Sequence, residues 1–321
     1  MMKTLMVVSG GDAPGINTLI ARYTMLAQAQ GDSVVGAMGG FEAVLSGQLR
    51  PIDLSMVRRM EGIGGSYLPS SRVPVLAEEN ARAQLRQTLQ DNEIDNVVLF
   101  GGDGTLRYVL PLLLEWQIPV AAIPTSIDND VTGTERTLGF DSACNFAYQA
   151  IEGILATAHA LPGRLFLLET LGGDTGYLAL EIAYAAGVHA VLVPEYDFDM
   201  NWLADRLKRA VTRDGFALAV VTEGVKTLPN LLEDIPRLTN TRLRFSRLGH
   251  AQRGGQVSHL DRKLATEMAH LAYETFKAGQ PGGALMVRQN QLLIVNELVT
   301  VAHKAPPDKA LYNHVNGLID H

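Results

Sequence analysis

Hydrophobic and polar positions along the chain follow two alternating patterns. Short apolar runs predict buried strands at 4–8, 33–37, 96–100, 119–123, 164–169, 188–193 and 217–222. Longer amphipathic segments between them predict helices near 16–29, 78–91, 104–115, 141–158, 175–186, 201–213 and 260–278. Strands that alternate with helices are typical of parallel sheets joined by right-handed crossovers, so we expect an α/β fold.

The amino-acid composition agrees with this fold class. Hydrophobic residues make up 47% of the 321 positions and aromatic residues only 6%, which predicts the aliphatic core of a parallel sheet. The length admits two ordinary domains or one large one. No low-complexity segment or Pro/Gly/Ser linker divides the chain, and a boundary is expected near residue 138, where a long predicted helix begins.

Charge and cysteine content narrow the possible functions. The net charge of -7 argues against a broad nucleic-acid-binding surface. The single cysteine, Cys144, excludes an intrachain disulfide and fits a reducing compartment. The apolar run at the N-terminus is too short for a signal peptide, and no stretch approaches the ~20 apolar residues that a membrane span needs. We therefore expect a soluble, cytoplasmic protein with no nucleic acid and no membrane as partner.

An unusual polar cluster follows the apolar run at 120–123. The sequence PTSIDND, residues 124–130, places two hydroxyl groups before two carboxylates, Asp128 and Asp130, that flank one amide. Asn and Asp cap backbone groups well, so a simple turn is one interpretation. An active site is the other, because open α/β sheets bind ligands at the carboxyl ends of their strands.

The tripeptide Gly-Gly-Asp follows an apolar run three times, at 10–12, 101–103 and 172–174. A glycine turn between a strand and a helix lets a phosphate group approach the backbone and the helix N-terminus. Glycine pairs also follow strands for geometric reasons alone, and none of the three sites matches a P-loop or a dinucleotide fingerprint. Asp103 makes the second site more specific, since a carboxylate beside phosphate-binding amides suits a bound Mg²⁺. We also expect Thr105 to cap the helix that follows.

Arginines gather in the segment RLRFSRLGHAQRGG, residues 242–255, of an otherwise acidic chain. A solvated surface is one interpretation of such a charge run. The interleaved glycines favour a second, a loop that folds around an anion, because guanidinium groups bind phosphate bidentately. Arg72 lies alone among turn residues in YLPSSRVP and is by default a surface residue.

Taken together, these stretches resemble the bacterial-type ATP-dependent 6-phosphofructokinases. The chain carries that family's motifs in order and spacing over nearly its whole length: SGGDAPGIN (9–17), GGDGT (101–105), PTSIDND (124–130), VTEG (221–224) and LGHAQRGG (248–255). GGDGT alone is shared with NAD kinases and diacylglycerol kinases, whereas IDND and LGHAQRGG together are highly specific. The resemblance implies two Rossmann-like three-layer α/β domains with parallel-rich sheets and an active site in the cleft between them. It assigns 1–138 plus 251–301 to nucleotide binding and 139–250 plus 302–321 to sugar-phosphate binding.

The same resemblance implies a role for each motif. The nucleotide would contact Gly11, Arg72, Val73, Gly102, Asp103, Gly104 and Thr105, and Asp103 would hold the Mg²⁺ that accompanies ATP. Fructose 6-phosphate would contact Ser126, Ile127, Asp128, Leu171, Gly172, Gly173, Glu223, His250 and Arg253. Asp128 would accept the proton of the sugar's 1-hydroxyl, with Asp130 and Arg72 also in the catalytic group. Arg164 and Arg244 would reach the 6-phosphate from a neighbouring subunit, which implies a homo-oligomer, usually a tetramer.

Departures from the family pattern leave alternatives open. Gly173 replaces an arginine that is usual beside the reacting phosphates, and the effector-site arginines have poor counterparts. Pyrophosphate-using relatives typically carry Asp at the position of Gly104 and Lys at that of Thr125, so we expect ATP as the donor, although Thr125 matches neither type. The alternatives are a pyrophosphate-dependent kinase, a kinase for another ketose phosphate, and a non-catalytic paralogue that binds ligand.

Overall fold

A computed structural model describes residues 1–71, 75–296 and 304–318 of the chain. The chain divides into two compact units. The first unit comprises Met1–Ser142 and Arg253–Lys304, and the second comprises Ala143–Gln252 and Ala305–His321. No helix in the described part of the chain is long and apolar enough to span a membrane.

The first unit contains a mixed sheet of seven strands in the order β11-β10-β5-β4-β1-β2-β3. Its strands are β1 (Lys3–Ser9), β2 (Ser33–Ala37), β3 (Leu49–Pro51), β4 (Asn96–Gly101), β5 (Val120–Pro124), β10 (Gly282–Arg288) and β11 (Gln291–Val295). The central strands run parallel, whereas β3 and β11 pair antiparallel with their neighbours at the two edges. The carboxyl ends of β1, β4 and β5 therefore lie next to one another.

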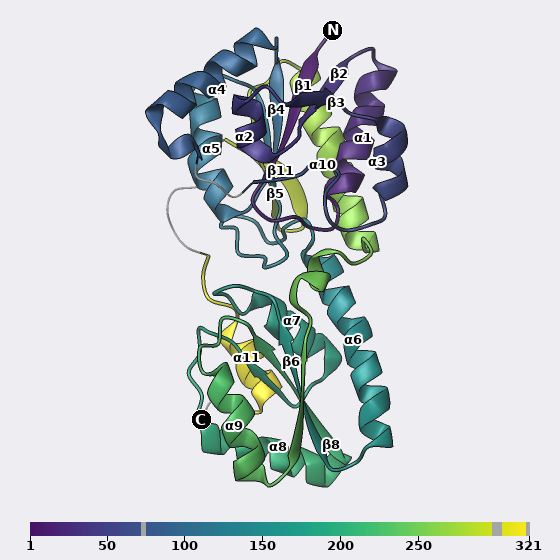
Figure 1. Cartoon of the computed structure of the whole chain (residues 1–321), viewed down its shortest axis with the longest axis vertical. Helices are drawn as coiled ribbons and strands as arrows, with labels where there is room; N and C mark the ends of the chain where they lie inside the picture. The colour runs from purple at the N-terminus through teal and green to yellow at the C-terminus, as the bar shows by residue number, and fades with distance from the viewer. Residues whose placement is uncertain (72–74, 297–303, 319–321) are drawn as a thin grey trace. The chain divides into compact units, whose positions relative to one another are not determined.

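Helices cover both faces of this sheet and give the unit three layers (Figure 1). One face carries α2 (Gly40–Leu45), α4 (Glu79–Asp91) and α5 (Asp103–Glu115), and the other carries α1 (Ile16–Ala29), α3 (Leu54–Met60) and α10 (His259–Lys277). The α2, α4 and α5 face buries a core of aliphatic side chains with few aromatics, as the composition predicts. The chain passes into the second unit within α6 (Phe140–Ala160).

The second unit contains a parallel sheet of four strands in the order β7-β8-β6-β9. The strands are β6 (Arg164–Thr170), β7 (Ala190–Leu192), β8 (Phe216–Thr222) and β9 (Arg242–Arg247). The helices are α7 (Tyr177–Ala186), α8 (Met200–Asp214), α9 (Leu228–Thr239) and α11 (Lys309–Asn316). α8 and α9 pack on one face of the sheet through an apolar cluster. α7 contacts strands β7 and β8, and α11 contacts α7 and β7.

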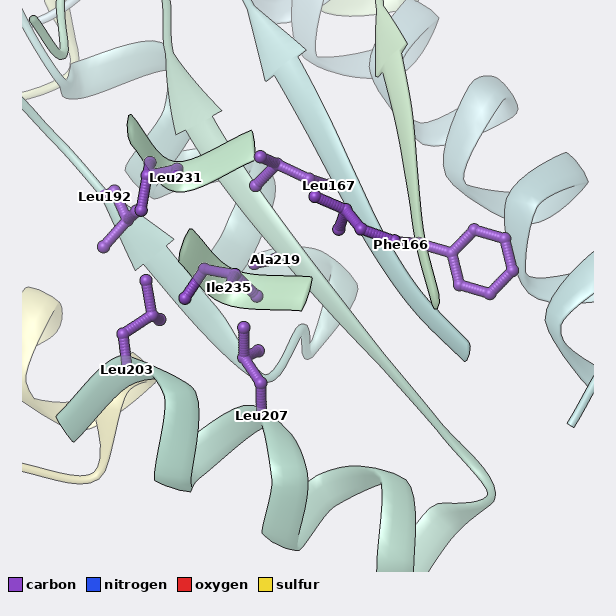
Figure 2. A pocket seen from close by; sticks show the side chains of 9 residues that line it. Phe166, Leu167, Leu192, Leu203, Leu207, Ala219, Leu231 and Ile235 are labelled. Carbon is purple, nitrogen blue, oxygen red and sulfur yellow. The ribbon is translucent and has the colours of Figure 1, made fainter. Parts of the chain in front are cut away.

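Figure 2 shows the packing under α8 and α9 from close by, where a cavity of about 10 Å³ remains. Leu203 and Leu207 of α8 point toward the sheet, and Leu231 and Ile235 of α9 lie across from them. A cavity of this size and apolar lining is a gap in a core, since even one water needs ~10–15 Å³ and polar partners.

Every strand and helix that the hydrophobic pattern predicts is present, with ends within two residues of those expected. The interpretation of 242–255 as a loop is wrong for its first half, because Arg242–Arg247 forms the edge strand β9. Leu243 and Phe245 alternate with polar residues there, and backbone hydrogen bonds to β6 fix the strand without a buried apolar run. The short elements β3, α2 and α3 lack an apolar period long enough to be recognised.

Candidate active site

Three motif loops of the first unit follow neighbouring parallel strands. The Gly10–Asp12 turn follows β1, Gly102 and Asp103 follow β4, and the PTSIDND segment follows β5. Because β5, β4 and β1 are adjacent in the sheet, these loops meet at one carboxyl edge, the usual place for a ligand in an open α/β sheet.

A pocket of about 730 Å³ opens beside two of these loops. Its lining combines Ser9 and Gly10 with Phe41, Val75–Ala77 and one side of α5, which runs from Gly104, Thr105 and Arg107 to Glu115. A methyl group at Gly104 would meet no protein atom within 4 Å, so a side chain there would extend into open space. Gly101 is required for a different reason, since a Cβ at that position would come within 2.4 Å of Thr105. The pocket is of a size that holds a drug-sized ligand such as a nucleotide.

The first turn of α5 places a carboxylate at the edge of this pocket. Asp103 Oδ2 lies 2.5 Å from Nε of Arg107, one helical turn away. Thr105 does not cap the helix as expected, because its hydroxyl donates to the carbonyl of Ser9 and lies 3.2 Å from Ser9 Oγ, while Gly102 is the N-cap. Thr105 thus joins the β1 turn to the β4 turn.

The residues here fit a Mg²⁺ that arrives with a nucleotide. No group of three or more His, Cys, Asp or Glu side chains that could hold a metal alone is present among the described residues. Mg²⁺ in phosphotransferases usually takes one or two carboxylates and completes its shell with phosphate oxygens and water. Asp103 supplies one such carboxylate beside the pocket.

The PTSIDND loop is held by its own polar side chains. Ser126 Oγ donates to Asp130 at 2.8 Å and accepts from the backbone N–H of Asp128 at 3.2 Å. Asn129 has a left-handed backbone conformation, and its amide oxygen accepts from the N–H of Thr137 at 3.0 Å. Ile127 is fully buried beneath the loop. The turn and active-site interpretations are therefore compatible: Ser126, Asn129 and Asp130 form the turn, and the turn fixes Asp128.

Arg253 connects this loop to a motif far away in the sequence. Its Nη2 lies 3.8 Å from Asp128 Oδ2, and its Nη1 donates to the carbonyl of Asp12 at 3.2 Å. Both side chains of the pair are largely shielded, with 14% of Arg253 and 17% of Asp128 exposed. The structure thus brings together the Gly-Gly-Asp turn after β1, the PTSIDND loop and the Arg-Gly-Gly that ends the motif LGHAQRGG.

Sequence reasoning missed two charged residues of this region, Arg107 and Lys304. The Lys304 ammonium donates to the backbone carbonyl of Asn129. Burial lowers the pKa of Lys304 to about 8, although Asp130 acts in the opposite direction. Arg107 could have been found from its spacing of four residues after Asp103 on a predicted helix, whereas Lys304 lies outside every motif.

In the second unit, two motif loops meet at the carboxyl ends of β6 and β8. Glu223 Oε1 accepts the backbone N–H of Gly173 at 3.1 Å. The chains approach so closely that a Cβ at Gly224 would lie 2.2 Å from the carbonyl of Gly173. Leu171 is anchored nearby, since its N–H donates to Gln252 at 3.0 Å, and a Cβ at Gly172 would lie 2.7 Å from Thr222. Residues Leu171–Gly173 and Glu223 are therefore brought together.

A second pocket, of about 670 Å³, lies beside these loops and includes Asp174 and the turn Gly224–Thr227. Asp174 does not cap the helix that follows it, α7. α7 has Gly176 at its N-cap with no side-chain capping bond, and Glu195 accepts the Gly176 N–H at 2.9 Å instead. Burial raises the pKa of this Glu195 carboxyl above its ordinary value.

The remaining arginines of the second unit stand apart from this cluster. Arg164 is the first residue of β6, so it lies at the end of the sheet opposite Glu223, about 20 Å away along a seven-residue strand. Arg244 is exposed in the middle of the edge strand β9, opposite Phe166 of β6. His250 lies in the short 3₁₀ turn Gly249–Arg253. Arg72 and Val73 lie outside the described residues.

Comparisons with known proteins follow the motifs over most of the chain. A family model described as phosphofructokinase matches residues 3–276. An ATP-dependent 6-phosphofructokinase of Lysinibacillus sphaericus is 36% identical over 294 residues, 91% of this chain and 92% of the relative. The fold is similar to that of Pichia pastoris phosphofructokinase in the T-state, with a TM-score of 0.83 and 27% identity over 91% of this chain and 34% of the yeast chain. A pyrophosphate-dependent phosphofructokinase of Marinobacter aquaeolei has a TM-score of 0.82 at 20% identity, over 95% of this chain and 86% of that one. This last likeness concerns the fold alone.

Proposed function

Because the chain belongs to the phosphofructokinase family, we propose that it is an ATP-dependent 6-phosphofructokinase, which transfers the γ-phosphoryl group of ATP to the 1-hydroxyl of fructose 6-phosphate. The observation that carries the proposal is the pairing of Asp128 with Arg253 beside the Asp12 carbonyl, at the carboxyl edge that also borders the large pocket.

Asp128 is the proposed general base. A sugar hydroxyl is a poor nucleophile, and a carboxylate within hydrogen-bond reach can accept its proton as it attacks the phosphoryl group. The Ser126–Asp130 hydrogen bond and the bond from the Asp128 N–H to Ser126 support a positioning role for Asp130. Arg253 places a positive charge near the attacking oxygen and the transferred group.

ATP is the proposed donor. Gly104 borders the pocket, and a Cβ there would extend into open space, so the aspartate typical of pyrophosphate-using relatives would occupy the space that an adenine nucleotide needs. Gly11, Gly102, Asp103 and Thr105 complete the proposed nucleotide contacts, with Arg72 and Val73. Mg²⁺ bound at Asp103 would offset the negative charge of the β- and γ-phosphates.

The second unit is proposed to hold the sugar phosphate through Glu223, His250 and the loop Leu171, Gly172 and Gly173. Arg164 and Glu223 lie at opposite ends of the sheet, which supports the idea that Arg164 and Arg244 serve the site of a neighbouring subunit. We propose a homotetramer on this ground. The low cysteine content is in keeping with a cytoplasmic enzyme.

A coupled assay tests this proposal. Purified protein is given ATP or pyrophosphate, each with fructose 6-phosphate and with several other ketose and aldose phosphates. We expect the highest kcat/KM for ATP with fructose 6-phosphate. A higher kcat/KM with pyrophosphate would contradict the donor, and a higher one with another sugar phosphate would indicate that the Gly173 departure belongs to a remodelled acceptor site. No turnover with any pair would support a non-catalytic paralogue.

A further inference from the structure

We propose that Arg107 is a phosphate-binding residue of the donor site, held by Asp103 until a metal-bound nucleotide occupies that carboxylate. The inference rests on the proposed function, because it concerns how the same pocket receives ATP. None of the family motifs contains Arg107, which follows GGDGT by two residues.

The geometry places Arg107 between a carboxylate and the pocket. Asp103 and Arg107 lie one turn apart at the start of α5, with Nε 2.5 Å from Oδ2. About a fifth of the Arg107 side chain and a quarter of the Asp103 side chain are exposed, so the pair is only partly hydrated. Arg107 lines the same pocket as Ser9, Gly10 and Gly104, the backbone positions at which phosphate could approach.

The charges of the region explain why such a residue is needed. A triphosphate that enters the pocket approaches the Asp103 carboxylate, and the two negative groups repel each other. The amino end of α5 offsets part of this repulsion through its dipole. A guanidinium group offsets more, since it carries a full charge and donates to phosphate through a planar set of N–H groups.

The Arg107 guanidinium and a metal ion compete for the negative charge of Asp103, because the two cations repel each other at close range. In the ligand-free chain the guanidinium holds the carboxylate. When Asp103 coordinates the metal of a bound nucleotide, the guanidinium loses that partner and lies beside the phosphates. Arg107 should therefore have opposite effects on two ligands: it competes with a free divalent cation and it favours the metal–nucleotide complex.

The experiment measures binding rather than turnover, on the full chain and without a sugar acceptor. Calorimetric titration gives the Kd for MgATP, and electron paramagnetic resonance gives the Kd for Mn²⁺ alone as a probe of the metal site. For Arg107→Gln we expect MgATP to bind about tenfold to a hundredfold more weakly, the usual cost of a lost hydrogen bond to a charged group. We expect Mn²⁺ alone to bind more tightly to this variant than to the wild type. The MgATP affinity of Arg107→Lys should lie between that of the wild type and that of Arg107→Gln.

The matched control is Lys263→Gln, which breaks an exposed ion pair of the same spacing, Lys263 with Glu267 in α10. This variant should bind both ligands like the wild type. Equal MgATP affinity in the wild type and Arg107→Gln would overturn the proposal. So would a parallel loss of MgATP and Mn²⁺ affinity in both Arg107 variants, because a merely structural ion pair would have that effect. A wild-type protein that binds no MgATP would instead overturn the proposed function itself.

Discussion

The two units of this molecule hold their candidate residues in different ways. In the first unit, Asp128 lies in a loop that is closed by side-chain hydrogen bonds and shielded by Arg253. In the second unit, Glu223 and Gly173 form one contact at the carboxyl edge, while Arg244 is exposed on an open strand edge and Arg164 lies at the far end of β6. The candidate residues of the first unit thus contact one another within one chain. Those of the second unit lie at opposite ends of the sheet and on its edge strand, β9.

This difference has a functional meaning. Phosphoryl transfer depends on positioning and on fixed charges, so a base and its neighbouring cation must be held before the substrate arrives. The first unit meets that requirement with residues of one chain. For the arginines of the second unit, Arg164 and Arg244, we propose that they meet it in the site of a neighbouring subunit.

Asp128→Asn tests whether the enclosed carboxylate of the first unit is the general base, and it should have the largest effect. The amide keeps the shape of the side chain but cannot accept a proton, and loss of a general base typically lowers kcat by ~10²–10⁴-fold. Fructose 6-phosphate binding, measured by calorimetry, should change little. A variant that keeps more than about a tenth of the wild-type kcat would show that Asp128 is not the base.

Arg244→Gln tests whether the exposed arginine on β9 of the second unit binds the sugar phosphate, and it should have the next largest effect. Loss of a charge-assisted contact to phosphate should raise the KM for fructose 6-phosphate about tenfold to a hundredfold. Arg242→Gln, two residues away on the same exposed strand, is the matched control and should keep the wild-type KM.

A mixing experiment makes the subunit assignment specific. Asp128→Asn and Arg244→Gln subunits are denatured together and reassembled. If Arg244 serves the neighbour's site, some mixed sites contain an intact Asp128 and an intact Arg244, and activity should exceed that of either variant alone. No gain in a mixture that assembles would place Arg244 in its own chain's site or in none.

Gly173→Arg tests whether the missing arginine at this position of the second unit limits turnover. A Cβ at Gly173 would meet no atom within 4 Å, so space is available, but the φ of +57° places the arginine in the left-handed region at a cost of ~1–2 kcal/mol. We expect kcat with fructose 6-phosphate to rise about tenfold, less than the ~10³-fold or more of arginine fingers, and KM to change less. Gly173→Ala isolates the backbone effect. An unchanged or lower kcat in a folded Gly173→Arg protein would show that the missing arginine does not limit turnover.

The same contrast explains how far the sequence could predict this molecule. Hydrophobic periodicity located the long elements because most of them bury a continuous apolar run or face, as β4 and α8 do. Motif loops could be assigned to one edge of the sheet because parallel strands present their carboxyl ends together. Both inferences depend only on local pattern and on general rules of α/β folds.

The remaining features depend on contacts between distant residues. The Asp128–Arg253 pair joins positions 125 residues apart, and Lys304 reaches the Asn129 carbonyl from outside every motif. β9 was missed because its arginines outweighed the alternation of Leu243 and Phe245. Local spacing could have revealed only Arg107, through its i,i+4 relation to Asp103.

The smallest expected effect concerns how buried and exposed carboxyls stabilise the two units. In the first unit Asp261 accepts from the N–H groups of Gly139 and Ser142 and from the Ser142 hydroxyl, and so joins the start of α6 to the start of α10. Burial raises the pKa of Asp261 to about 6, although these hydrogen bonds act against the rise. In the second unit Arg213 and then His189 lower the pKa of Asp214 to about 2.

These opposite shifts predict opposite pH dependences. Between about pH 4 and 6 the folded protein holds a proton on Asp261 that the unfolded chain releases, so the stability from this group is lost as the pH rises through about 6. Asp261→Asn should abolish that loss of stability, because an amide does not titrate. The variant should be less stable than the wild type overall, because its amide nitrogen cannot accept a hydrogen bond. The gap between its thermal midpoint and that of the wild type should therefore narrow from pH 4 to 6, by about 2–4 °C for each kcal/mol. Asp214→Asn is the control with the reverse sign, since the stability from Asp214 is present above about pH 4 and lost as the pH falls toward 2. A gap for Asp261→Asn that stays constant from pH 4 to 6 would show that Asp261 does not titrate in this range, and that the first unit is held by a permanently charged carboxylate.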